Sequence, residues 1–193
     1  MTHILYLAAG NSRRFGENKL LYPLDGKPLY RHGLDTLAAA AQQRTDCTLT
    51  VVSRHRAVLD GAAAQHIRTV YSPESEKGLS YTIRAGVGAL DLQQTDFILC
   101  AAADQPYLSV QTVLRLLDAA RPGVACARVC WGEQRGNPAL FSAALVPALR
   151  ALTGDEGGRV LLRRGDCVPV FAASARELWD VDTKAQLCPP PQA

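Results

Sequence analysis

Stretches of apolar residues alternate with amphipathic stretches along most of the chain. Runs rich in apolar and β-branched residues predict strands, and these runs cover residues 4–7, 48–53, 67–71, 97–102, 124–131, 138–141 and 168–172. Apolar residues at helical spacing predict helices over residues 28–41, 55–64, 79–90, 110–117, 142–152 and 156–163. Because strands and helices alternate in this order, we predict a single-domain α/β fold with a doubly wound, mainly parallel, Rossmann-like sheet.

Three local signals refine these boundaries. Pro28 suits the first position of a helix, where its missing N–H group is not needed. Ser109 precedes an amphipathic segment and is a suitable N-cap. The last six residues, Cys-Pro-Pro-Pro-Gln-Ala at 188–193, predict an unstructured tail.

Composition narrows the class of protein. The chain has 193 residues, of which 48% are hydrophobic and 20% charged, so it is long enough to bury a full core. A net charge of +3 and an aromatic content of 6% do not indicate nucleic acid binding. No apolar run reaches the roughly 18 residues that a membrane span needs, and the N-terminus does not resemble a secretory signal. The mild charge is compatible with small anionic ligands. We expect a cytoplasmic protein with its six cysteines as reduced thiols.

The loop that follows the first predicted strand carries the clearest chemical signal. Small residues at positions 8–10 let backbone N–H groups approach a phosphate, and Arg13, Arg14 and Lys19 follow within the same loop. In open α/β sheets ligands bind at the carboxyl ends of strands, where this loop lies. The Walker and dinucleotide-binding patterns do not apply, because the number and spacing of the glycines do not match. We interpret the segment as a polyphosphate loop; a solvated basic turn is the alternative.

Carboxylates at two other positions can complete a metal site. Asp104 follows the apolar run 97–102, so its side chain emerges at the same edge of the sheet as the basic loop. It can cap the turn before Pro106, or it can hold Mg²⁺ together with phosphate oxygens. Asp180 and Asp182 share one side of an extended segment, so either can join Asp104; a solvated acidic strand end is the alternative.

Six segments, taken in order, resemble the motifs of GT-A-like nucleotidyltransferases of the MobA-like NTP transferase family. They are residues 7–21 with 26–29 (LAAGNSRRFGENKLL and GKPL), 77–80 with 84–86 (KGLS and RAG), 104–106 (DQP), 135–141 (RGNPALF), 154–159 (GDEGGR) and 180–183 (DVDT). More narrowly, the chain looks like the cytidylyltransferases that convert molybdopterin-type molybdenum cofactor to its cytosine dinucleotide. It departs from their pattern at Phe15, where Met is usual, at Asn137, where His is common, and at 184–186, where Pro-Glu-Asp is usual.

The resemblance implies that residues 1–187 form a nucleotidyltransferase domain, with a nucleotide-binding part at 1–110 and an acceptor-binding part at 111–187. It also implies transfer of CMP from CTP to the phosphate of the cofactor, with Mg²⁺ as the metal. The implied nucleotide-binding residues are Leu7, Ala8, Ala9, Gly10, Ser12, Arg13, Arg14, Lys19, Ser80 and Arg84. Those implied in catalysis are Arg14, Lys19 and Asp104, those for the metal Asp104 and Asp182, and those for the acceptor Arg135, Asn137, Asp155 and Arg159.

The choice of base and acceptor depends on few residues. In the resembled group, Leu-Ala-Ala-Gly accompanies CTP and Leu-Ala-Gly-Gly accompanies GTP, so Leu7-Ala8-Ala9-Gly10 favours CTP. The alternatives are GTP as donor, or an acceptor such as a sugar 1-phosphate or phosphocholine. A non-enzymatic carrier or chaperone of molybdenum cofactor is a third interpretation. A molybdoenzyme or its maturation chaperone is the expected protein partner.

Overall fold

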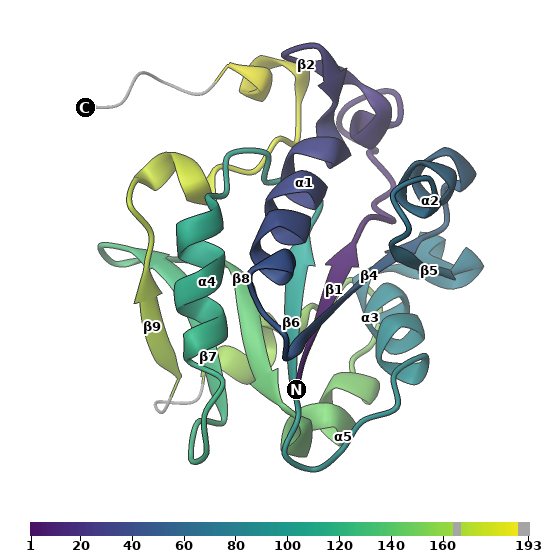
Figure 1. The fold of residues 1–193 in the computed structure, drawn as a ribbon. Helices are drawn as coiled ribbons and strands as arrows, with labels where there is room; N and C mark the ends of the chain where they lie inside the picture. The colour runs from purple at the N-terminus through teal and green to yellow at the C-terminus, as the bar shows by residue number, and fades with distance from the viewer. Residues whose placement is uncertain (164–166, 189–193) are drawn as a thin grey trace.

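A computed structural model describes residues 1–163 and 167–188, and within these ranges seven strands form one central sheet (Figure 1). The sheet order is β5-β4-β1-β6-β8-β7-β9. Its strands are β1 (Thr2–Leu7), β4 (Cys47–Ser53), β5 (Arg68–Tyr71), β6 (Phe97–Ala102), β7 (Cys126–Trp131), β8 (Gln134–Ser142) and β9 (Val168–Phe171). Neighbouring strands are parallel except where β8 pairs with β6 and β7. A small hairpin, β2 (Pro23–Leu24) and β3 (Lys27–Pro28), lies outside this sheet.

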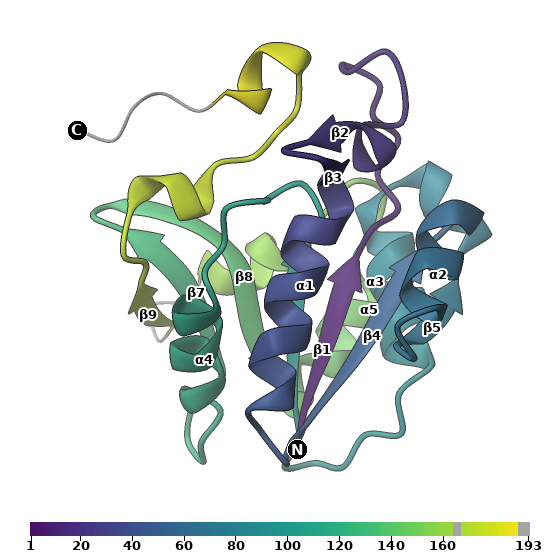
Figure 2. The ribbon, with the colours of Figure 1, turned by 45° about the horizontal axis from the view of Figure 1, so that its top comes forward.

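Helices cover both faces of the sheet. One core lies beneath α1 (Leu29–Gln42), α2 (Arg56–Ala63) and α4 (Val110–Asp118). The other lies beneath α3 (Leu79–Gly88) and α5 (Val146–Arg150). Figure 2 shows α1 and α4 in front of the sheet and α3 and α5 behind it. Alternate residues of β1 serve the two cores, because successive side chains of a strand point to opposite faces.

Short 3₁₀ helices complete the described structure. They are Lys19–Leu21, Pro73–Lys77, Ala143–Leu145, Gly158–Arg163, Ala175–Leu178 and Lys184–Leu187. The segment from Ala175 to Cys188, yellow in Figure 1, crosses the end of the sheet where the loop after β1 also lies. None of the helices in the described ranges is long and apolar enough to cross a membrane.

The predicted fold class is confirmed, and so are most of the predicted elements. The predicted helix start at Pro28 is wrong by one residue, because Pro28 is the N-cap of α1 and ends β3. The strand predicted at 138–141 is too short, since β8 begins at Gln134 and pairs with β7 through a tight turn that contains Gly132 at φ +54°. Ser109 is the N-cap of α4, as expected.

The helices predicted at 142–152 and 156–163 are wrong in type or extent. The first is a 3₁₀ turn followed by the short α5, and the second is a 3₁₀ helix. Adjacent glycines at 157 and 158 have low helix propensity, which explains why no α-helix begins there. All six cysteines are free. The tail predicted at 188–193 lies, beyond Cys188, outside the described residues.

A buried carboxylate fixes the end of the sheet where β1 and β6 begin. Asp96 accepts hydrogen bonds from the Met1 amino group at 2.8 Å and the Gln93 N–H at 2.9 Å, and it contacts His3 Nε2 at 3.2 Å. Burial by itself would raise the pKa of Asp96, but these partners lower it from 3.8 to about 2. The native state therefore favours the charged carboxylate.

We expect Asp96→Asn to lower the free energy of unfolding by about 2 kcal/mol at pH 7. Because the pKa is lowered in the folded state, this stability is present above the ordinary pKa of 3.8 and is lost as the pH falls to about 2. Urea unfolding of both proteins at pH 7 and at pH 2.5 measures the difference. Asp91→Asn, at an exposed position in the same connection, is the control. An Asp96→Asn effect that is equal at both pH values would contradict the lowered pKa.

Candidate active site

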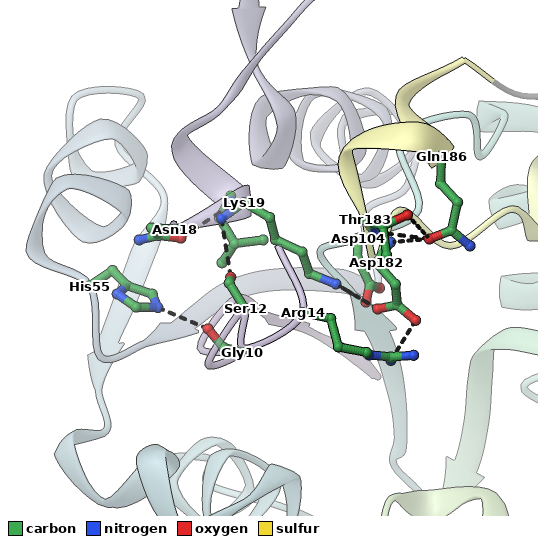
Figure 3. Close-up of polar contacts among 11 residues, drawn as sticks. Gly10, Ser12, Arg14, Asn18, Lys19, His55, Asp104, Asp182, Thr183 and Gln186 are labelled. Atoms are coloured by element: carbon green, nitrogen blue, oxygen red, sulfur yellow. Dashed lines mark hydrogen bonds and ion pairs between the residues drawn. The ribbon is translucent and has the colours of Figure 1, made fainter. Parts of the chain in front are cut away.

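The loop after β1 is held in place by hydrogen bonds to two neighbouring segments. The Ser53 hydroxyl donates to the Ala8 carbonyl at 2.6 Å. Figure 3 shows His55, whose Nε2 lies 3.2 Å from the Gly10 carbonyl oxygen. Asn11 donates its side-chain N–H to the Glu76 carbonyl at 2.9 Å. The connection after β4 and the 3₁₀ helix at 73–77 therefore fix the loop against the sheet edge.

Two cations of this loop meet two carboxylates at the same edge. Lys19 Nζ lies 2.9 Å from Asp104 Oδ2 and 3.0 Å from Asp182 Oδ1. Arg14 Nη2 lies 2.7 Å from Asp182 Oδ2 (Figure 3). The Val181 N–H also donates to the Asp104 carbonyl at 2.9 Å, which joins the two carboxylate segments through the backbone. The structure thus brings together Arg14, Lys19, Asp104 and Asp182 in one ion-pair network.

Charges of this network shift the pKa values of Lys19 and Asp180. Burial opposes the charged form of Lys19, but Asp104 and Asp182 raise its pKa above the ordinary value. Lys19 is therefore a permanent cation at neutral pH. For Asp180, burial together with the charge of Asp104 raises the pKa to about 6.

The segment that carries Asp182 is fixed by Gln186. The Gln186 Oε1 atom accepts hydrogen bonds from the Asp182 N–H at 3.0 Å and the Thr183 N–H at 2.9 Å. The Thr183 hydroxyl donates to the same atom at 3.1 Å (Figure 3). Thr183 and Gln186 form a capping box, so the unusual sequence at 184–186 still starts a helical turn.

The first cavity lies over the loop and has a volume of about 470 Å³. Predicted site residues that line it are Leu7, Ala9, Gly10, Ser12, Arg13, Arg14, Lys19, Asp104, Asp155 and Asp182. Ala8 is fully buried instead, with its N–H donated to Val52 and its carbonyl bound by Ser53. Ser75, Gly78 and Thr82 also line this cavity, although the sequence did not single them out for the nucleotide.

The second cavity, of about 540 Å³, adjoins the first. All four residues predicted for the acceptor, Arg135, Asn137, Asp155 and Arg159, line it. Leu7, Leu79 and Asp155 line both cavities, so the two share a wall. Asp180 lines the second cavity, whereas Asp182 lines the first. The alternation along residues 180–182 predicted both carboxylates on one side of the segment, but the structure places them in different cavities.

Comparison with known proteins identifies the family of this chain. A family model described as the MobA-like NTP transferase domain matches residues 4–169. The chain belongs to the MobA-like NTP transferase family. It is therefore by family a nucleotidyltransferase, and the expected family resemblance is confirmed.

Two curated relatives match almost the whole chain. The purine catabolism protein PucB of Bacillus subtilis (strain 168) is 32% identical over 190 residues, which are 93% of this chain and 90% of PucB. The nicotine blue oxidoreductase of Paenarthrobacter nicotinovorans is 32% identical over 193 residues, 94% of this chain and 92% of that protein.

Solved structures confirm the MobA-like fold. A nucleotidyl transferase from Methanothermobacter thermautotroptrophicus covers 96% of this chain and 94% of its own, with a TM-score of 0.79 and 23% identity. The manganese complex of Rv0371C from Mycobacterium tuberculosis H37Rv has a TM-score of 0.73, 24% identity and coverage of 96% and 94%. Molybdopterin-guanine dinucleotide biosynthesis protein A from Archaeoglobus fulgidus has a TM-score of 0.69, 15% identity and coverage of 97% and 95%.

The two carboxylates of the candidate site suit a hard divalent cation. Within residues 1–163 and 167–188, no group of three or more His, Cys, Asp or Glu side chains is arranged to hold a metal. Asp104 and Asp182, however, converge on one ammonium group, so they approach closely enough to share a cation. Mg²⁺ is commonly held by one or two carboxylates with phosphate oxygens and water. Two convergent carboxylates beside the predicted phosphate-binding loop fit that pattern.

Two predicted nucleotide residues, Ser80 and Arg84, have other contacts. The Ser80 hydroxyl donates to the Gly154 carbonyl at 2.8 Å. The Arg84 guanidinium lies 4.2 Å from the centre of the Tyr81 ring. Ser80 thereby joins the start of α3 to the Gly-Asp-Glu-Gly-Gly-Arg loop at 154–159, which lines the second cavity. The KGLS and GDEGGR motifs thus meet in space.

Gly78 is required where these two motifs meet. Its φ is +138°, and a Cβ atom there would overlap the backbone of Gly154. We expect Gly78→Ala to lower the free energy of unfolding by about 1–3 kcal/mol, because it adds backbone strain and pushes the 154 loop away. Nucleotide binding should weaken as well, since Gly78 lines the first cavity. Urea unfolding and nucleotide titration measure the two effects.

Gly88, at the end of the same helix, provides the matched control. A Cβ atom at Gly88 would meet open space, and its φ is ordinary. Gly88→Ala should leave stability unchanged or raise it by about 0.5–1 kcal/mol. If Gly78→Ala were as stable as Gly88→Ala, the packing of the two motifs would not depend on the glycine.

Proposed function

We propose that this protein transfers CMP from CTP to the phosphate of a molybdopterin-type molybdenum cofactor and releases pyrophosphate. The observation that carries the proposal is the shared wall between the two cavities. One cavity offers the cationic loop and the two carboxylates, and the other offers the residues expected for the acceptor. A nucleotidyl donor and a phosphorylated acceptor can then lie side by side.

Positive charge in the second cavity suits an acceptor that carries phosphate. Arg128, Arg135, Arg159 and Arg163 all line it. Arginine pairs with phosphate through two parallel hydrogen bonds, which fixes the direction of the acceptor. We assign residues 111–187 to acceptor binding, with Asp182 reaching back to the nucleotide part at 1–110.

The proposed reaction needs charge neutralisation more than acid–base chemistry. The phosphate monoester of the acceptor is largely dianionic near neutral pH, so it attacks the α-phosphorus without a general base. Arg14 and Lys19 would stabilise charge on the α-phosphoryl group and on the leaving pyrophosphate. A divalent cation held by Asp104 and Asp182, with Mg²⁺ as our choice, would neutralise phosphate oxygens when bound. Holding both substrates in line supplies the remaining rate enhancement.

The proposed preference for CTP rests on Ala9. Ala9 lines the first cavity, whereas Ala8 is buried behind it. The Ala9 methyl group would crowd a purine more than a pyrimidine. One methyl group gives about 1–3 kcal/mol of discrimination, so we expect a preference of roughly 10- to 200-fold.

Names among the similar proteins agree with part of this proposal. One structural neighbour is a molybdopterin-guanine dinucleotide biosynthesis protein, and another is a manganese complex. One curated relative is named an oxidoreductase and another a purine catabolism protein. Because these names differ in activity, the decisive experiment must identify the reaction itself.

That experiment measures pyrophosphate release from each of the four nucleoside triphosphates, with and without molybdenum cofactor and Mg²⁺. We expect release from CTP only when cofactor and Mg²⁺ are both present, together with formation of the cytosine dinucleotide. The product would then pass to a molybdoenzyme or its maturation chaperone. Pyrophosphate release with a sugar 1-phosphate or phosphocholine instead would show that the acceptor is not the molybdenum cofactor. Release from GTP alone would show that the donor is not CTP. Cofactor binding with no release from any nucleotide would favour a carrier.

A further inference from the structure

Lys19 fills the position between the two carboxylates that the proposed function assigns to a divalent cation. Its ammonium contacts Asp104 Oδ2 and Asp182 Oδ1, while Arg14 contacts Asp182 Oδ2. Three of the four carboxylate oxygens are therefore already bound to cations of this chain. A divalent ion held by both carboxylates would need an oxygen of Asp182 that Lys19 or Arg14 now contacts, and it would lie beside the Lys19 ammonium.

The backbone of Lys19 is fixed, and its side chain lies between the two carboxylates and lines the first cavity. The Lys19 N–H donates to Ser12 Oγ at 3.1 Å, and Asn18 caps the 3₁₀ turn that Lys19 begins. Only 9% of the Lys19 side chain is exposed, so solvent does not screen its contacts strongly. Lys19 also lines the first cavity, where a triphosphate would lie. Both the carboxylates and the phosphates are therefore within the reach of one anchored side chain.

Electrostatic repulsion prevents the Lys19 ammonium and a divalent ion from sharing the two carboxylates at the same time. A divalent ion placed beside Lys19 without nucleotide would displace the ammonium from its partners and then repel it. A triphosphate offers Lys19 and Arg14 new anionic partners. Once the cations turn to the phosphates, Asp104 and Asp182 lose their counter-charges and attract a divalent ion.

We propose that Lys19 is a resident counter-cation that keeps Asp104 and Asp182 closed to divalent metal until a nucleotide draws it away. Metal and nucleotide then strengthen each other's binding, and by linkage the coupling is the same in both directions. The inference rests on the proposed function for its metal ligands and nucleotide cavity, but it concerns the order of binding rather than the reaction.

The test measures Mn²⁺ binding to the nucleotide-free protein by calorimetry and electron paramagnetic resonance. Lys19→Met should bind Mn²⁺ about 5- to 150-fold more tightly than the wild type, the range of typical couplings between sites. Lys19→Gln repeats the measurement in case methionine impairs folding. Arg14→Met, at a side chain that is 73% exposed, should give a smaller gain, because it releases only one oxygen of Asp182.

Matched variants separate this effect from a general change in charge. Lys27→Met removes one positive charge at a surface pair with Asp35 and should leave Mn²⁺ affinity unchanged. Lys19→Arg keeps a cation between the carboxylates and should keep binding weak. Adding Asp104→Asn to Lys19→Met should abolish the gain.

Three results would overturn the inference. They are an unchanged Mn²⁺ affinity in folded Lys19→Met or Lys19→Gln, an equal gain in Lys19→Arg or Lys27→Met, and a gain that survives Asp104→Asn. None of these measurements uses a nucleotide or an acceptor. If the cytidylyl transfer experiment fails, the Mn²⁺ measurements can therefore still be interpreted. If the Mn²⁺ affinities do not change as expected, the proposed substrates are unaffected.

Discussion

Asp104→Asn is expected to lower kcat for nucleotidyl transfer by at least about 10³-fold while the fold is kept. The substitution removes one of the two carboxylates that converge at the phosphate loop. The amide still offers an oxygen to Lys19, and the Asp104 backbone carbonyl still accepts the Val181 N–H, so the segments remain joined. Pyrophosphate release under saturating nucleotide and Mg²⁺ measures the loss, and thermal unfolding followed by circular dichroism measures the fold.

Asp60→Asn is the control for this prediction, because Asp60 is an exposed carboxylate on α2, away from both cavities. It should leave turnover and melting temperature unchanged. A shift of about 2–4 °C for Asp104→Asn would correspond to about 1 kcal/mol and would still be compatible with an intact fold. Near-normal turnover in Asp104→Asn would remove this residue from the metal site and from catalysis.

The parallel half of the sheet could be predicted because its strands are buried on both faces. β6 and residues 4–7 of β1 are unbroken apolar runs, which is typical of central parallel strands. The antiparallel strand β8 could not be predicted at its full length. Its first part, Gln134–Asn137, is exposed or half-buried beside the second cavity and so carries no apolar signal.

The halves of the candidate site could be predicted separately, but their contact could not. The basic loop and Asp104 each follow a strand, and strand ends meet at one edge of the sheet. Lys19 and Asp182 are 163 positions apart, so spacing says nothing about their distance. The sequence assigns one to phosphate and the other to metal, whereas the structure pairs them with each other.

Long-range packing also explains the placement of Ser80. The KGLS motif indicates a nucleotide contact, and Ser80 is one residue after Leu79, which lines both cavities. A helix turns about 100° per residue, so neighbours point in different directions. The Ser80 hydroxyl faces Gly154 instead, a partner 74 positions away that no local pattern reveals.

Lys19→Met should lower kcat by at least about 10²-fold, even though it is expected to bind free metal more tightly. The ammonium is the only group of this network that contacts both carboxylates, so its loss removes positive charge from the place where the pyrophosphate would leave. Steady-state kinetics at Mg²⁺ concentrations from low values to well above saturation separates the effect on metal binding from the effect on catalysis. If weak metal binding limited the wild type, Lys19→Met would be faster at low Mg²⁺.

Our expectation is that Lys19→Met stays slow at every Mg²⁺ concentration, because its defect lies in charge stabilisation and not in metal occupancy. Arg14→Met is the companion variant, since in the described ranges Arg14 pairs with Asp182 but not with Asp104, and its side chain is mostly exposed. It should lower kcat less than Lys19→Met does, because solvent screens the charge of an exposed guanidinium more strongly than that of a buried ammonium. Turnover of Lys19→Met equal to or faster than that of the wild type at low Mg²⁺ would show that the ammonium serves only to exclude metal. A joint loss of kcat and kcat/KM would show that the same ammonium acts in the transition state.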